Sequence, residues 1–170
     1  MSNFSLSRVI LLIGFTLITG VSPAFAAVYS INGSEIDSPL LSDLIRSDPT
    51  LISGELPPGQ VIFFWNTHCG ACHMTWDFLD EFIPDHPEMK WSDYNLFNST
   101  ENRTIFEKYK EKYSRSHLSV PSMMIGNITL EGTQDIRNHL GEILNLQQNI
   151  SPSPVLNTYI QDFFRNFKLM

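Results

Sequence analysis

The feature that most constrains this chain is an apolar run that leads into a pair of closely spaced cysteines. The run, Val61–Trp65, is rich in β-branched and aromatic residues, which is typical of a central strand buried on both faces. Cys69 and Cys72 follow it, and the periodicity of residues 71–83 is helical until Pro84. The sequence therefore predicts an α/β fold with both cysteines at a strand-to-helix junction.

These two cysteines are the only ones in the chain. A bridge between Cys69 and Cys72 would close a very small loop, so by loop-closure entropy it would stabilise the fold little. Two cysteines also cannot build the several bridges that hold small secreted domains together. Reactivity explains the pair better than structural cross-linking does.

A helix N-terminus is a suitable place for a nucleophilic cysteine. The attacking species is the thiolate, which the helix dipole and the unpaired backbone N–H groups stabilise. Cys69 is therefore predicted to be the nucleophile, and Cys72, one turn further on, the thiol that resolves a mixed disulfide. A protonated His68 or His73 would stabilise the thiolate further. The alternative is that both histidines are exposed polar residues at a helix start.

The N-terminus has the pattern of an export signal. Arg8 is followed by an uncharged stretch over 9–21 and by an A-x-A cleavage motif at 24–26. We expect residues 1–26 to be a cleaved signal peptide and the mature chain to be periplasmic or secreted, where disulfides persist. An uncleaved membrane anchor over 9–27 is the less favoured alternative, because that stretch is only marginally long enough to span a bilayer.

Composition and charge exclude several other classes. A chain of 170 residues with 42% hydrophobic residues can bury one core, and we expect one domain over 27–150. The net charge of −7 argues against nucleic acid as a partner. Two cysteines and scattered histidines provide no second ligand pair, so no metal site is predicted. After prolines at 152 and 154, a helical extension over 151–170 is expected to cover the domain core, or to bind a partner or membrane surface.

The rest of the chain alternates short strands with amphipathic segments. Further strands are expected at 28–31, 89–97, 123–125 and 128–130, and further helices over 38–46, 100–113 and 133–144. Ser38 and either Ser99 or Thr100 are expected to cap two of these helices with their side-chain oxygens. A turn at Gly126-Asn127 is expected to join two of the strands into a hairpin.

The cysteine junction together with the later Val120-Pro121 resembles the thioredoxin superfamily, and the resemblance covers most of residues 28–146. This superfamily places a cis-proline opposite the dithiol, just before a strand, and 119–123 matches that pattern; an ordinary trans proline is the alternative. The resemblance implies a thioredoxin-like α/β fold, with a central mixed sheet of four to five strands flanked by helices. It also implies that the backbone of Val120 pairs with a substrate chain as an added strand.

Further details of the sequence refine this resemblance. Residues 120–136 look like the C-terminal half of a glutaredoxin, but Glu131 stands where glutaredoxins commonly have the first of two glycines. This substitution disfavours glutathione as a partner without excluding it, and Gly132 and Asp135 are better explained as a helix start. Phe63 stands where many thioredoxins carry a buried aspartate. The chain therefore resembles a compact, glutaredoxin-sized domain and is not a close copy of cytosolic thioredoxin.

The implied function is thiol–disulfide exchange with protein substrates outside the cytoplasm, without a cofactor. Oxidation, reduction and isomerisation all remain open, because they differ by reduction potential. A membrane-bound redox partner is expected, since soluble reductants are scarce in that compartment.

Two alternatives to this function remain. The stretch 69–73 also fits the C-x-x-C-H attachment site of a c-type haem. In that case His73 would be the proximal ligand and Met123 or Met124 the distal one. The other alternative is a non-catalytic binding module that has kept the fold.

Overall fold

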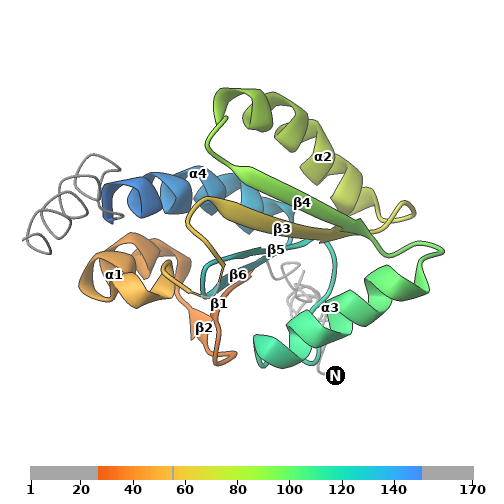
Figure 1. Ribbon diagram of the computed structural model, residues 1–170, viewed down its shortest axis with the longest axis horizontal. Coiled ribbons are helices and arrows are strands. Elements are labelled where there is room, and N and C mark those ends of the chain that lie inside the picture. Colours follow the sequence, from red (N-terminus) through yellow and green to blue (C-terminus); the bar gives the residue numbers. More distant parts are fainter. Residues whose placement is uncertain (1–26, 55, 151–170) are drawn as a thin grey trace, which may run out of the picture.

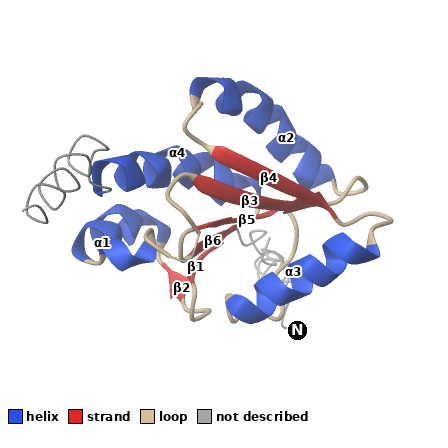
Figure 2. Cartoon of the chain, in the orientation of Figure 1, coloured by secondary structure: helices blue, strands red, loops and turns tan. Residues whose placement is uncertain are grey.

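The computed structural model describes residues 27–54 and 56–150, which form a sheet with helices on both faces (Figure 1, Figure 2). The strands are β1 (Ala27–Ser30), β2 (Glu35–Ile36), β3 (Gln60–Trp65), β4 (Lys90–Asn95), β5 (Ser122–Ile125) and β6 (Ile128–Glu131). The α-helices are α1 (Leu41–Ser47), α2 (Gly70–Phe82), α3 (Thr100–Lys112) and α4 (Thr133–Ile150), and 3₁₀ turns cover Ser38–Leu40, Pro49–Leu51 and Ile83–Asp85. The expected signal peptide and C-terminal extension lie outside the described residues.

The strands form one mixed sheet in the order β2-β1-β6-β5-β3-β4. β3 runs parallel to β4, to which α2 connects it, while β5 pairs antiparallel with both β3 and β6. β1 pairs antiparallel with β6 and with β2. The predicted α/β class and mixed sheet are confirmed. The predicted number of four to five strands is wrong, because the described residues contain six.

The additional strand is β2, which forms a short hairpin with β1. Gly33 has φ +81° and donates its N–H to the carbonyl of Ser30 at 2.9 Å, which reverses the chain. A left-handed φ of this kind is easily adopted only by glycine. β2 contains only two residues, so it is too short to show the alternation by which a strand is detected in a sequence.

The apolar run at 61–65 forms the central part of the structure. Val61 and Phe63 pack into the core on the face covered by α2 and α4, and Ile62 and Phe64 pack into the core on the face covered by α3 (Figure 1). All four side chains are buried. This explains why the run has no polar residue between its apolar ones, and it confirms the prediction of a strand buried on both faces.

Short sequence patterns predicted one helix cap and one hairpin turn correctly, and a second helix cap wrongly. Ser99 caps α3, because its Oγ accepts the backbone N–H of Asn102 at 3.1 Å. The hairpin of β5 and β6 turns at Gly126 and Asn127, as predicted. The predicted cap at Ser38 is wrong: Asp37 is the N-cap, and Ser38 is the first residue of a 3₁₀ turn.

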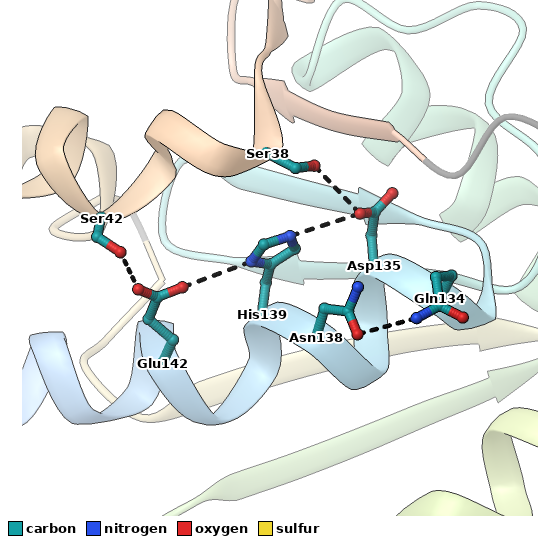
Figure 3. Close-up of polar contacts among 7 residues, drawn as sticks. All are labelled: Ser38, Ser42, Gln134, Asp135, Asn138, His139 and Glu142. Carbon is teal, nitrogen blue, oxygen red and sulfur yellow. Dashed lines mark hydrogen bonds and ion pairs between the residues drawn. The ribbon is translucent and has the colours of Figure 1, made fainter.

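The hydroxyl of Ser38 is used in a polar cluster that joins α4 to residues 38–42 (Figure 3). It donates to Asp135 Oδ1 at 3.2 Å, and Ser42 donates to Glu142. Between the two acids, His139 lies 3.5 Å from Asp135 Oδ1 and 3.5 Å from Glu142 Oε2. Ser38 thus has a tertiary partner far along the chain, which the local capping pattern could not reveal.

Burial makes Asp135 the unusual member of this cluster, since only 4% of its surface is exposed. Desolvation raises the pKa of its carboxyl group, Glu35 raises it further, and the Ser38 hydroxyl and His139 oppose the rise. A carboxyl with a raised folded-state pKa favours folding in its protonated form. Its contribution to stability is complete below the unfolded pKa of about 3.9 and is lost as pH rises through the folded pKa.

We therefore predict that Asp135→Asn removes this loss, because asparagine can still accept the Ser38 hydroxyl but cannot ionise. The free energy of unfolding of the variant, minus that of the wild type, should increase as pH rises from about 4 to about 7. Urea unfolding across that range measures the difference. Asp77→Asn, at an exposed position on α2, is the control and should give no such trend. Parallel curves for wild type and Asp135→Asn would contradict the prediction.

Candidate active site

The cysteines lie at the junction between β3 and α2. A disulfide joins Cys69 to Cys72, with their Cα atoms 5.2 Å apart. Cys69 is the N-cap of α2 and its sulfur accepts the backbone N–H of Cys72 at 3.1 Å. The sulfur therefore occupies the place that a serine or aspartate oxygen takes in an ordinary cap. A thiolate there would receive an N–H bond and face the positive end of the helix dipole.

The two cysteines differ in their exposure. Cys69 is partly exposed, whereas Cys72 is 0% exposed and packs into the protein. Cys72 is shielded because it begins the buried side of α2, which continues with Thr75 and Leu79. An incoming molecule can thus reach the first sulfur and not the second. This asymmetry fits the predicted roles of nucleophile and resolving thiol.

Asparagine side chains organise the loop between β3 and α2. Asn66 Oδ1 accepts the N–H of His68 at 2.9 Å, and its carbonyl accepts the N–H of Cys69 at 3.0 Å. Asn95, at the end of β4, donates to the hydroxyl of Thr67 at 2.7 Å. The neighbouring parallel strand therefore holds the loop in place. Sequence analysis had assigned no role to either asparagine.

The histidines that flank the dithiol have other partners. His68 is exposed, and its ring lies edge-on to Phe97 with the centroids 4.1 Å apart. The Nε2 of His73 lies 2.7 Å from the carbonyl oxygen of Thr67, to which it can donate. Both side chains thus stabilise the rim of the loop. Their predicted influence on the Cys69 thiolate stays a prediction.

The loop that contains Val120 and Pro121 lies next to the dithiol. The peptide bond between Val120 and Pro121 is cis, which confirms the predicted isomer. The carbonyl oxygen of Val120 lies 3.7 Å from the sulfur of Cys69, although the two residues are far apart in the sequence. Pro121 is buried and leads directly into β5. The predicted pairing of Val120 with a substrate backbone stays a prediction.

Glu131 holds the segment before this proline. Its carboxylate accepts hydrogen bonds from both the backbone N–H and the hydroxyl of Ser119, and it forms an ion pair with Arg115 at 3.6 Å. The Arg115 guanidinium in turn lies over the ring of Tyr29, 3.5 Å from its centroid. The sequence signalled Glu131 only as a departure from the glutaredoxin pattern. In the structure, its hydrogen bonds to Ser119 hold the loop that precedes Pro121 in place.

A pair of threonine hydroxyls lies behind the dithiol, and sequence analysis missed both. Thr75 is on α2, and Thr133 is the first residue of α4. Their Oγ1 atoms are 2.9 Å apart. Each of them also reaches the carbonyl oxygen of Ala71, at 2.9 Å and 2.8 Å respectively. The start of α4 is thereby joined to the residue that precedes Cys72.

Aromatic rings surround Phe63, which lies in the middle of β3. Phe63 is buried, and its ring meets those of Trp76 and Trp91 with centroid distances of 5.5 Å. Trp76 also meets Trp65, the last residue of β3, at 5.4 Å. The surroundings of Phe63 are therefore apolar rather than acidic.

The residues named for a haem site have separate environments. His73 is exposed on the first turn of α2. Met123 and Met124 are both fully buried, one in the core on the α2 and α4 face and the other in the core on the α3 face. Each methionine is thus part of the packed interior. The structure does not bring these candidate axial ligands together around a shared space.

Neither metal-site geometry nor a spanning helix is found in the described parts of the chain. Within 27–54 and 56–150, no group of three or more His, Cys, Asp or Glu side chains is arranged to hold a metal ion. Over the same residues, no helix combines the length and the apolar character needed to cross a membrane.

Comparison with protein-family models and with curated proteins finds no match to the chain. The site must therefore be interpreted from its own chemistry.

The difference in exposure predicts selective alkylation of the reduced chain. Iodoacetamide should modify Cys69 roughly tenfold or more faster than Cys72, because reaction requires an accessible thiolate. Peptide mass spectrometry after a brief exposure measures the two rates. The variant Cys69→Ser serves as the control and should be modified at the slow rate. Equal rates at the two cysteines in the wild-type chain would contradict the prediction.

Proposed function

We propose that this chain is a thiol–disulfide oxidoreductase of thioredoxin-like fold that acts on protein substrates outside the cytoplasm. The observation that carries the proposal is the position of the Cys69 sulfur. It is partly exposed, caps a helix, is bonded to a buried Cys72 and faces the carbonyl of Val120 across the loop of a cis-proline. A disulfide that served only stability would not need this accessible, thiolate-stabilising position.

The arrangement of the elements supports the same proposal. The parallel pair β3 and β4, the antiparallel hairpin of β5 and β6, and the placing of α2 and α4 on one face with α3 on the other agree with the fold that the sequence resemblance implies. The sixth strand, β2, pairs only with β1 at the edge of the sheet and leaves the dithiol junction unchanged.

In the reductive direction, the Cys69 thiolate attacks one sulfur of a substrate disulfide. The substrate S–S bond breaks, one substrate sulfur leaves as thiolate, and a mixed disulfide with Cys69 forms. Cys72 then loses its proton and attacks the Cys69 sulfur, which releases the second substrate thiolate. The substrate gains two electrons and two protons, and the chain becomes the Cys69–Cys72 disulfide. Oxidation of a substrate dithiol is the reverse of these steps.

The proton of Cys72 must leave without a carboxylate at position 63. Phe63 and the rings around it cannot accept a proton. We propose that the first substrate thiolate, which is released beside the dithiol, or a water molecule accepts it. The exchange thereby couples deprotonation of Cys72 to departure of the substrate sulfur.

The loop before β5 suits an extended polypeptide as substrate. Ser119, bonded to Glu131, holds the chain before Val120, and the carbonyl of Val120 faces the reactive sulfur. An extended chain that pairs with this backbone would bring its own cysteine next to Cys69. Glu131, which stands where glutaredoxins commonly have a glycine, is bonded to Ser119 and paired with Arg115, and a protein chain is therefore proposed as the substrate in preference to glutathione.

The proposed compartment and partner follow from the exported character of the sequence. A cleaved signal over 1–26 would deliver the chain to an oxidising space, and a membrane-bound redox protein would exchange electrons with its dithiol. The haem alternative has less support, because His73 and the two methionines have separate surroundings. Spectroscopy of the purified chain decides the matter, since a Soret band would show haem.

Substitution of Cys72 tests the exchange mechanism. Cys72→Ser should accumulate a mixed disulfide between Cys69 and a disulfide-bonded protein such as insulin, because nothing resolves the intermediate. A band of added mass on a non-reducing gel, abolished by dithiothreitol, reports it. Cys69→Ser is the matched control and should trap nothing, because Cys72 is buried. If neither variant forms an adduct, the chain is a binding module or a haem protein and the proposal is wrong.

The reduction potential gives a second test. We predict a value between about −120 and about −270 mV, the range of dedicated exchange proteins, from equilibration with glutathione buffers. A value near the upper limit would assign oxidation of substrates, and one near the lower limit would assign reduction. A potential below about −300 mV is typical of structural disulfides and would contradict the proposed function.

A further inference from the structure

One peptide group at the dithiol is hydrogen-bonded at both of its ends. The group that joins Ala71 to Cys72 donates its N–H to the Cys69 sulfur at 3.1 Å. Its carbonyl oxygen lies within 2.8 Å of the Thr133 hydroxyl and 2.9 Å of the Thr75 hydroxyl. The two hydroxyls are therefore connected to the reactive sulfur through a single planar amide.

The protons in this group can be counted. The Thr75 and Thr133 oxygens are 2.9 Å apart, so three short contacts link the two hydroxyls and the Ala71 carbonyl. Each hydroxyl has one proton to donate. The two cannot donate to each other at the same time. When Thr75 donates to the Thr133 oxygen, the Thr133 proton is directed at the carbonyl of Ala71.

A donor on a carbonyl changes the other end of the amide. It draws electron density toward the oxygen and makes the N–H of the same peptide group a stronger donor, an effect of about 10–30% per bond in a chain of hydrogen bonds. Here the strengthened N–H belongs to Cys72 and points at Cys69. Thr75 is 0% exposed, so water does not dilute the effect at that hydroxyl.

Ordinary helix chemistry accounts for only part of this arrangement. A threonine that bonds to the carbonyl four residues earlier, as Thr75 does, is common in helices. Thr133 is not explained in this way, because it comes from the first turn of α4 rather than from α2. Its place is set by Gly132, whose N–H donates to the carbonyl of Pro121 at 2.8 Å. The proline loop thereby positions the hydroxyl that reaches the dithiol.

We propose that Thr133 is a positioning residue that stabilises the Cys69 thiolate through the Ala71–Cys72 peptide group, with Thr75 orienting its hydroxyl. The proposal deepens the proposed function, on which its biological meaning rests. Stabilising the thiolate stabilises the reduced form of the pair, so the interaction makes the chain a stronger oxidant. The loop that is proposed to bind substrate and the helix that carries the dithiol would then be linked by one hydroxyl.

The test is a titration of the reduced, full-length chain by the ultraviolet absorbance of its thiolate. Thr133→Val keeps the shape of the side chain and removes the donor, and Thr133→Ser keeps the donor. We expect Thr133→Val to lower the acid dissociation constant of Cys69 by about two- to fivefold, and Thr133→Ser to match the wild type. The reduction potential of Thr133→Val should become more negative. Circular dichroism verifies that each variant is folded, and Thr133→Ala replaces Thr133→Val if the latter does not fold.

Two results would overturn the inference. One is a folded Thr133→Val with the Cys69 titration of the wild type, which would leave Thr133 only a structural link between α2 and α4. The other is a shift in Thr133→Ser as large as that in Thr133→Val, because the retained donor should then have protected the thiolate. The titration uses no substrate, so it can fail while wild-type exchange with insulin succeeds. Conversely, absence of exchange with a normal titration difference would reject the proposed function alone.

Discussion

The burial of β3 on both faces is the constraint on which the rest of the structure depends. Its side chains alternate between two cores, so the strand cannot slip by one residue without exchanging Phe63 and Phe64 between them. A fixed strand delivers the loop at 66–68 and then the N-terminus of α2 to a defined place. The Cys69 sulfur can therefore act as a helix cap, where backbone amides favour its charged form.

The site itself is assembled from three parts of the chain that meet at the end of the sheet. α2 supplies the cysteines, the segment before β5 supplies the Val120 carbonyl, and the start of α4 supplies Thr133. Short polar links hold these parts together, such as those from Glu131 to Ser119 and from Gly132 to the Pro121 carbonyl. Packing of the sheet and helices positions the elements, and these links set the finer geometry around the sulfur.

Patterns that repeat along one element were predicted well from the sequence. The continuous apolar run of β3, the helical spacing of α2 and the cap at Ser99 all depend on neighbours within a few residues. Predictions failed where a distant partner decided the outcome. β2 is too short for a pattern and exists only by pairing with β1, and the hydroxyl of Ser38 bonds to Asp135 on α4 instead of capping its own helix.

The same division applies to the candidate site. The sequence by itself determined that two cysteines lie at the junction of a buried strand and a helix, because hydrophobic periodicity and C-x-x-C spacing are local properties. Only the tertiary structure decided that Cys69 is accessible while Cys72 is buried, and that Glu131 and Thr133 reach the site. Burial and long-range hydrogen bonds depend on which elements pack together. A single glutamate or threonine therefore carries no periodic signal of the partner that it will meet.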